Sequence, residues 1–186
     1  AYGALGHRVE DNSEGGADNL GRVLAAQVQY IQNSVDGEPG EKVGVFDSDA
    51  LNGTINKNCD LGIYGLLDKP VSNELYPDLL PVAGADEVKA GPATILTVLE
   101  GETLEEFEIE ISRVSPQKHA ADKGMVMKIT DERLLARAGG SVQGMSGSPI
   151  IQDGKLVGAV THVFVNDASS GYACFAEWML EEAKEL

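Results

Sequence analysis

The 186-residue chain carries 30 acidic and 14 basic residues, which gives a formal net charge of −16 at pH 7. Nucleic acids bind clustered Lys and Arg, and anionic membranes repel an acidic chain, so we expect neither a nucleic-acid partner nor membrane insertion. The apolar fraction of 42%, with 22 glycines and no apolar run of about 20 residues, is typical of a soluble, turn-rich globular protein. We expect one domain, residues 1–186, built from two halves.

Short segments rich in Val, Ile, Leu and Thr alternate with clusters of Gly, Asn and Asp, a pattern typical of an all-β barrel or sandwich. The expected strands are Arg22–Ile31, Lys42–Phe46, Gly62–Leu67, Thr94–Leu99, Glu106–Ser112, Met125–Ile129 and a strand from Leu156 onward. Acidic and apolar residues alternate strictly in Glu106–Ile111, so one face of that strand should be buried and the other solvated.

Three further segments have other patterns. Ser72–Leu80 fits neither strand nor helix clearly, whereas Asp131–Ala138 favours a short helix with Asp131 as its N-cap. Phe175–Leu186 places apolar residues among acidic ones at helical spacing. We therefore expect the chain to close with an amphipathic helix.

The most informative segment is Gly144-Met145-Ser146-Gly147-Ser148-Pro149, which leads into an apolar strand. Glycines on both sides of Ser146 allow a tight turn that aims the hydroxyl outward and brings peptide N–H groups toward one point. By spacing, the N–H groups of Gly144 and Ser146 would form an oxyanion hole, which stabilises the charge on a scissile carbonyl. The alternative is a glycine-rich turn without a catalytic role.

A serine hydroxyl needs a base to take its proton, and histidine suits this task near neutral pH. The chain has three histidines. His7 follows the apolar Ala4-Leu5-Gly6, so its ring would stand at the end of a barrel strand. His119 lies in a polar stretch typical of an exposed loop. His162 follows Thr161 on the strand after Ser146, where both residues would line the substrate cleft, with His162 also a rival base.

A third group, usually a carboxylate, must hold the histidine in the right tautomer. Asp131 lies between His7 and Ser146 in the sequence, but so do Asp47, Asp49 and Asp60. Position alone does not choose among them, and the N-cap interpretation of Asp131 competes with a catalytic one.

Other chemistry has little support. Cys59 and Cys174 lie far apart without metal-ligand spacing, so we interpret them as small buried residues and leave a disulfide between them open. The histidines and acidic residues form no ligand pattern, so we expect no metal and no cofactor.

At the level of longer segments the chain resembles the SpoIVB peptidases, stage IV sporulation proteins of endospore-forming bacteria. The matching segments cover essentially the whole chain: Gly3–His7, Gly62–Gly65, Gly91–Leu96, Val142–Ile151, Gly158–Asp167 and Glu177–Leu180. The resemblance implies a mainly β, chymotrypsin-like double barrel with a C-terminal helix.

The resemblance also implies a function. It points to a serine endopeptidase in the space between the mother-cell and forespore membranes. There it would cut a membrane-bound regulator of sigma-factor processing, and also itself. Carried over by motif, the family's histidine, aspartate and serine fall on His7, Asp131 and Ser146.

Family members have a membrane anchor and a PDZ domain before the peptidase domain, and neither is recognised here. Barrels of this kind normally supply strands before the histidine, so we expect a fragment with N-terminal strands missing. We expect an extended substrate to add as an extra strand along the Val157–Val163 edge. The alternative functions are a non-catalytic β-barrel that binds a protein partner along the same edge, and an inactive relative of the peptidases.

Overall fold

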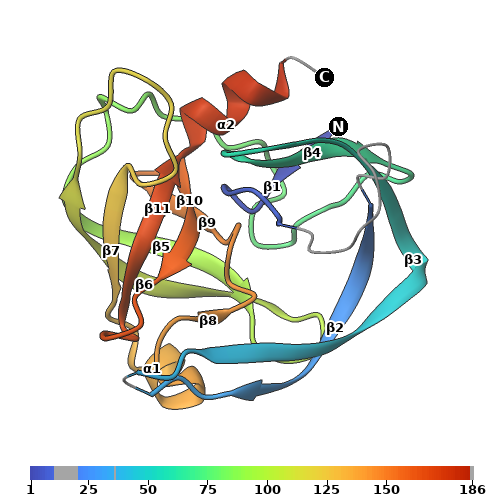
Figure 1. Cartoon of the computed structure of the whole chain (residues 1–186), viewed down its shortest axis with the longest axis horizontal. Coiled ribbons are helices and arrows are strands. Elements are labelled where there is room, and N and C mark those ends of the chain that lie inside the picture. The colour runs from blue at the N-terminus through green and yellow to red at the C-terminus, as the bar shows by residue number, and fades with distance from the viewer. Residues whose placement is uncertain (11–20, 36, 185–186) are drawn as a thin grey trace.

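The computed structural model describes residues 1–10, 21–35 and 37–184. The chain is mostly β, as predicted, and falls into a sheet half and a barrel half that lie side by side (Figure 1). The elements are β1 (Tyr2–Ala4), β2 (Arg22–Gln32), β3 (Gly40–Cys59), β4 (Gly62–Leu67), β5 (Gly91–Val98), β6 (Leu104–Val114), β7 (Met125–Ile129), α1 (Glu132–Ala138), β8 (Val142–Gln143), β9 (Pro149–Gln152), β10 (Lys155–Val163), β11 (Ser170–Phe175) and α2 (Ala176–Ala183).

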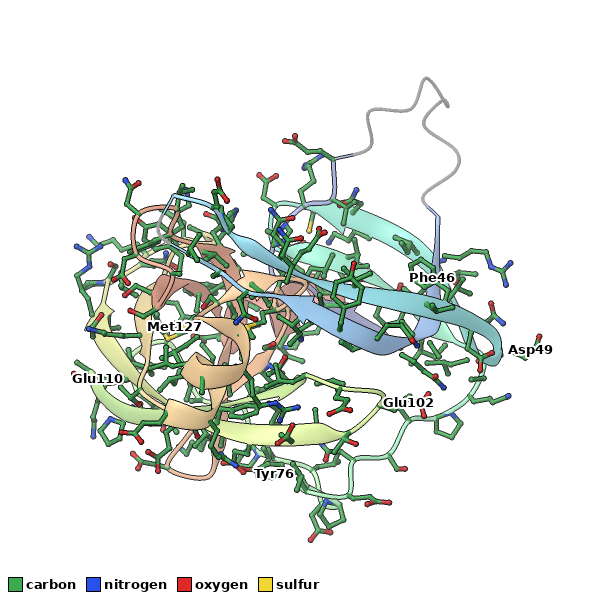
Figure 2. The ribbon with its side chains drawn as sticks, turned by 90° about the horizontal axis from the view of Figure 1, so that it is seen from below. Phe46, Asp49, Tyr76, Glu102, Glu110 and Met127 are labelled. Carbon is green, nitrogen blue, oxygen red and sulfur yellow. The ribbon has the colours of Figure 1, made fainter. Side chains whose placement is uncertain are left out.

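The barrel half closes through the strand order β10-β11-β7-β6-β5-β9. Its core follows from the alternation seen in the sequence, because Phe107, Ile109 and Ile111 of β6 point inward and are at most 2% exposed. Met125 and Met127 of β7 join them in one cluster, and Figure 2 shows Met127 inside the barrel. This packed barrel is the rigid base from which the loop carrying Ser146 rises.

The sheet half is an open sheet rather than a second closed barrel in the described part of the chain. Its order is β1-β4-β3-β2, and β8 pairs in parallel with β3 through Gly40 and Val142. The predicted double barrel is therefore realised as one closed barrel and one curved sheet. Strand β8 belongs to the sheet half although it lies between barrel segments in the sequence, so it ties the halves together just before Ser146.

Strand β3 differs most from the prediction, because it is twenty residues long instead of covering only Lys42–Phe46. The expected strand ended before the Asp and Asn residues that follow Phe46. The register against β2 shifts there from Asp47 to Asn52, so β3 continues through a bulge whose residues have no partner on β2. Figure 2 shows Phe46 and Asp49 on this projecting end of the sheet.

The strands β1, β8, β9 and β11 lie outside the expected ranges. β8 and β9 are short strands on either side of the Ser146 turn, and β1 and β11 were missed for different reasons. β1 has only three residues and is defined by its pairing with β4, from Tyr2 opposite Gly65 to Ala4 opposite Ile63. β11 is buried on both faces, so it lacks the alternation that marks a half-exposed strand. Phe175, which we assigned to the closing helix, ends β11 and is the N-cap of α2. Ser72–Leu80 contains neither helix nor strand.

Both predicted helices are present, although residues 185–186 of the second prediction lie outside the described residues. α2 packs against β1, β10 and β11, and its Glu182 forms an ion pair with Lys57 of β3 at 2.5 Å. The helix thus contacts both halves. No helix in the described part of the chain is long and apolar enough to cross a membrane.

Asp131 is the N-cap of α1, as the sequence indicated. Its side chain accepts hydrogen bonds from the N–H groups of Arg133 and Leu134, and Gly139 ends the helix in the left-handed conformation with φ 71°. Hydrogen bonds from Arg133, then bonds from the main chain, hold the pKa of Asp131 at about 2, below its ordinary value of 3.8. Ionised Asp131 therefore stabilises the folded state.

We predict that Asp131→Ala lowers the free energy of unfolding at pH 7 by about 1 to 2 kcal/mol, because α1 loses its cap and Arg133 its partner. The pKa is lowered in the folded state, so this contribution is present above pH 4 and is lost as the pH falls toward 2. Urea unfolding at pH 7, 4 and 2.5 measures the difference, with the exposed Asp78→Ala as the control. A difference that stays constant over this pH range contradicts the prediction.

Candidate functional site

Ser146 lies on a sharp loop between β8 and β9. Gly144 and Gly147, on either side of it, have φ values of 91° and 86°, in the left-handed region that favours glycine. The buried side chain of Met145 anchors the loop on the barrel core. Ser146 itself is half-buried, and its hydroxyl donates a hydrogen bond of 2.9 Å to the carbonyl oxygen of Thr161 on β10.

Along residues 144–147 of this loop, main-chain N–H groups that donate a hydrogen bond alternate with groups that do not. Met145 N–H donates to Val142 O at 3.1 Å, and Gly147 N–H donates to Val160 O at 2.8 Å. The N–H groups of Gly144 and Ser146 donate to no turn or loop carbonyl of the described residues. These are the two donors that the sequence assigned to an oxyanion hole, so the turn keeps available the groups that such a site requires.

Lys42 of β3 packs beneath this loop. A Cβ atom placed on Gly144 would lie 3.2 Å from Lys42 Cβ, and the Lys42 ammonium group donates to Thr97 Oγ1 at 2.6 Å. Burial lowers the pKa of Lys42 to about 8. The sheet half therefore supports the candidate oxyanion loop through a lysine stem as well as through the β3 to β8 pairing.

The segment that carries His7 follows β1 and approaches the same loop at Leu5. The N–H of Gly6 donates to Ala4 O at 3.0 Å, and Leu5 between them has φ 72°, a strained conformation for a residue with a side chain. A Cβ atom on Gly147 would lie 2.8 Å from Leu5 N, and one on Gly6 would lie 2.9 Å from Thr161 Cγ2. The backbone at Gly147 therefore lies against the backbone of Leu5, and Gly6 lies against the side chain of Thr161, so neither position has room for a larger residue.

The His7 ring is oriented by its own neighbour. Its Nδ1 lies 2.8 Å from Arg8 O, and since a carbonyl oxygen only accepts, the proton must be on Nδ1 and the free lone pair on Nε2. Arg8 in turn pairs with Asp60 at 3.1 Å. His7 thus has the tautomer that a base acting through Nε2 needs.

His162 lies beside His7, with the two ring centroids 5.2 Å apart and the planes tilted by 41°. Its Nδ1 is buried, has no hydrogen-bond partner in the described part of the chain, and lies 3.9 Å from Asp122 Oδ2. Burial first, and then the nearby His7, lower the pKa of His162. Asp122 was not a candidate from sequence, because nothing in Ala121-Asp122-Lys123 indicates its tertiary neighbour.

The structure therefore gathers His7, Ser146, Thr161 and His162. Thr161 is buried, and its hydroxyl donates a hydrogen bond to Asp122 O at 3.1 Å. Its carbonyl oxygen accepts the hydrogen bond from Ser146. The pairing of β9 with β10 ends at Ala159, whereas β11 continues alongside to Val163. The predicted substrate edge of Val157–Val163 is thus limited to the residues after Val160.

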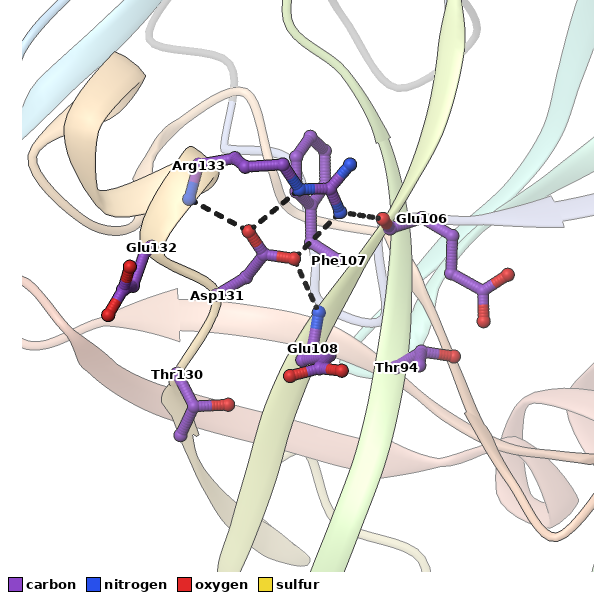
Figure 3. A pocket seen from close by; sticks show the side chains of 8 residues that line it. All are labelled: Thr94, Glu106, Phe107, Glu108, Thr130, Asp131, Glu132 and Arg133. Atoms are coloured by element: carbon purple, nitrogen blue, oxygen red, sulfur yellow. Dashed lines mark hydrogen bonds and ion pairs between the residues drawn. The ribbon is translucent and has the colours of Figure 1, made fainter.

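Asp131 lies elsewhere in the barrel half, at the start of α1 (Figure 3). Its carboxylate accepts from Arg133 Nη2 at 2.7 Å, from Arg133 Nε at 3.1 Å and from Glu108 N–H at 3.2 Å. No hydrogen bond or ion pair among the described residues joins it to His7, His162 or Ser146. The structure does not bring Asp131 into contact with the three residues around Thr161.

The other aspartates that the sequence left open are placed as follows. Asp47 accepts from the main-chain N–H groups of Asp49 and Ala50, on the projecting end of β3. Asp60 contacts Arg8, next to His7. His119 is exposed, as expected of a loop residue.

Both cysteines are free thiols. Cys174 is buried, and burial raises its pKa to about 12, so it is not a nucleophile at neutral pH. Over residues 1–10, 21–35 and 37–184, no three His, Cys, Asp or Glu side chains gather closely enough to hold a metal ion.

Comparison with known proteins gives one family match. The model of the SpoIVB peptidase S55 family matches residues 1–180. Among solved structures, the active form of the Rv3671c protease from M. tuberculosis has a TM-score of 0.49 and 16% identity, over 84% of this chain and 70% of that one. Its inactive form has a TM-score of 0.48 and 15% identity, over 86% and 82%. No curated protein matches the chain significantly.

We predict that Gly147→Ala displaces the segment carrying His7, because the new methyl group would meet Leu5 N at 2.8 Å. Gly154→Ala is a matched control, since Gly154 also has a positive φ of 74° but faces open space. Gly147→Ala should cost about 1 to 3 kcal/mol more than the control in urea unfolding. It should also speed amide exchange at residues 4–7. Equal effects of the two variants would contradict the close contact.

Proposed function

The chain belongs to the SpoIVB peptidase S55 family, and from that membership and the site geometry we propose that it cleaves proteins with Ser146 as nucleophile and His7 as general base. The observation that supports this assignment is the meeting of the Ser146 loop with residues 4–7 at the close approach of Gly147 and Leu5. The family is one of serine peptidases, whose substrates are proteins.

The reaction starts with a rotation of the serine side chain. At rest the Ser146 hydroxyl donates a hydrogen bond to the carbonyl oxygen of Thr161, which precedes His162 on β10. Rotation away from this carbonyl brings the O–H toward His7 Nε2, whose lone pair takes the proton as Ser146 Oγ bonds to the substrate carbonyl carbon. The resting hydrogen bond therefore holds the nucleophile protonated until substrate is present.

The carbonyl oxygen of the substrate gains negative charge in this step. The N–H groups of Gly144 and Ser146 are the donors for this charge. Protonated His7 then gives its proton to the leaving amine, the C–N bond breaks, and a water molecule hydrolyses the acyl-enzyme by the same sequence in reverse. Each step uses groups from the Ser146 loop and from the segment after β1, which approach each other at Gly147 and Leu5.

For the substrate and the location, the support is the resemblance to the family alone. We extend the proposal to a membrane-bound regulator of sigma-factor processing, cut between the mother-cell and forespore membranes, and to cleavage of the chain by itself. An extended substrate segment would add along β10 after Val160, where β9 no longer pairs with it. Thr161 and His162 would then line the cleft.

A binding module without activity is the second candidate. The observation in its favour is that Ser146 donates to Thr161 O instead of His7. The two candidates differ in whether the serine is activated, and the following experiment separates them.

We predict that a small fluorophosphonate labels the wild-type chain at Ser146, because only an activated serine reacts. Ser146→Ala should abolish labelling, and His7→Ala should slow it on the order of a hundredfold or more, the contribution of a positioned base. Ser112→Ala, on β6, should label like the wild type. Intact-mass spectrometry gives the extent of labelling, and a folded wild-type chain that is not labelled would favour the binding module.

Self-cleavage gives a separate prediction. During incubation the wild-type chain should accumulate fragments that Ser146→Ala does not, and their masses should locate the cut. Fragments that form at the same rate in both chains would come from a contaminating protease, and would remove this part of the proposal.

A further inference from the structure

The geometry points to His162, whose Nδ1 lies 3.9 Å from the Asp122 carboxylate, as the residue that positions His7 and stabilises it once it has taken the serine proton. This inference rests on the proposed roles of Ser146 and His7. It assigns the third member of the site to a second histidine from β10, a role that sequence reasoning gave to an aspartate.

The need for such a group follows from the surroundings of His7. Its Nδ1–H donates to the Arg8 carbonyl, which is neutral, and no carboxylate of the described residues forms a hydrogen bond with it. A carbonyl fixes the tautomer but gives little stabilisation to a full positive charge compared with an anion. The site therefore needs a negative group near His7 when the imidazolium forms.

The aspartates differ in how far their charge is already neutralised. Asp131 accepts from the guanidinium of Arg133, and Asp60 pairs with that of Arg8. Asp122 pairs with neither Lys nor Arg in the described part of the chain, and the side chain it approaches is His162, at 3.9 Å. Of these three aspartates, Asp122 is therefore the one whose negative charge can act on His7 and His162.

His162 connects this charge to His7. Its ring lies 5.2 Å from the His7 ring, centroid to centroid, and its buried Nδ1 has no partner in the described residues other than the distant Asp122 carboxylate. A buried donor without an acceptor is costly, so a closure of under about 1 Å that joins Nδ1–H to Asp122 is favourable. That bond fixes the proton on Nδ1 and leaves Nε2 with a lone pair.

The local contacts allow such a closure. Thr161 Oγ1 donates to Asp122 O at 3.1 Å, so the Asp122 segment is already attached to β10 one residue before His162. The charged and titratable groups that face His162 are His7, Asp122 and Lys123, whose ammonium lies 5.4 Å from the Tyr172 ring. Burial and the neighbouring His7 both lower the pKa of His162, which keeps it neutral while His7 is charged.

In the reaction, the proton from Ser146 moves to His7 Nε2 and no other bond to hydrogen changes. Neutral His162 and ionised Asp122 then lie next to the imidazolium and lower its energy until it gives the proton to the leaving amine. His162 is a positioning residue here, since it acts through His7 and not on the substrate.

The test is the rate of fluorophosphonate labelling from pH 5 to 9, because this small reagent reacts with Ser146 without binding as a peptide. His162→Ala should slow labelling on the order of a hundredfold at neutral pH, as expected for a partner of a proton-transfer group. His119→Ala, an exposed histidine, is the matched control and should match the wild type.

Asp122→Asn removes the charge without changing the shape of the side chain. It should slow labelling and move the acidic limb of the pH profile to lower pH, because the protonated histidine pair loses its counter-charge. Asp153→Asn, an exposed carboxylate in the turn before β10, should leave both rate and profile unchanged.

Two further variants separate the outcomes. His162→Gln keeps an N–H donor for Asp122 and should label faster than His162→Ala but slower than the wild type, which also provides a result should the alanine variant not fold. If Asp131→Asn slows labelling and His162→Ala does not, Asp131 is the third group and the inference is overturned. Wild-type rates in all His162 and Asp122 variants also overturn it.

These failures differ from a failure of the proposed function. A folded wild-type chain that is never labelled refutes the role of Ser146, whereas a labelled wild type with unaffected variants refutes only the role of His162. If His162 merely bound substrate, its variants would cleave a peptide more slowly and still react with the fluorophosphonate at the wild-type rate.

Discussion

The close approach between residues 4–7 and the Ser146 loop is the constraint on which the candidate site depends. Ser146 belongs to the barrel half and His7 to the sheet half, so their meeting requires two backbones in direct contact. Gly147 makes the contact with Leu5 sterically possible, and the positive φ of Leu5 is the local strain that accompanies it. The ladder of β8 with β3 joins the two halves, and the ladder of β1 with β4 holds the segment before His7 on the sheet half.

The charged side chains of the molecule also differ in their partners. The chain is strongly acidic, yet its aspartates are not equivalent, because Asp60 and Asp131 form ion pairs with arginines while Asp122 faces a histidine. Charge alone therefore does not make an aspartate a partner of the base. Whether the negative charge of a carboxylate acts on a nearby histidine depends on the counter-ions of that carboxylate. A carboxylate that no sequence motif marks can therefore stabilise a histidine more than one that lies in a recognisable motif.

The sequence predicted those features that depend on local pattern. Strict alternation located β6, the glycines around Ser146 located the sharp loop, and Asp131 was identified as a helix cap from its place before an apolar run. Features that depend on distant partners were missed. The three residues of β1 form a strand only because β4 is beside them, and Asp122 gains its interest only from the folding of His162 toward it. The catalytic roles themselves stay predictions.

The short length of strand β1 has a further consequence for how the molecule unfolds. In the described chain it is a three-residue edge strand, paired with β4 alone, while Ser146 stands on a closed barrel. Regions held by few ladder bonds open locally at a lower free energy than the whole fold. We therefore expect His7, the proposed base, to separate from Ser146 while the barrel, with Trp178 packed against its core, stays folded. In mild denaturant, loss of the proposed activity would then precede loss of the barrel.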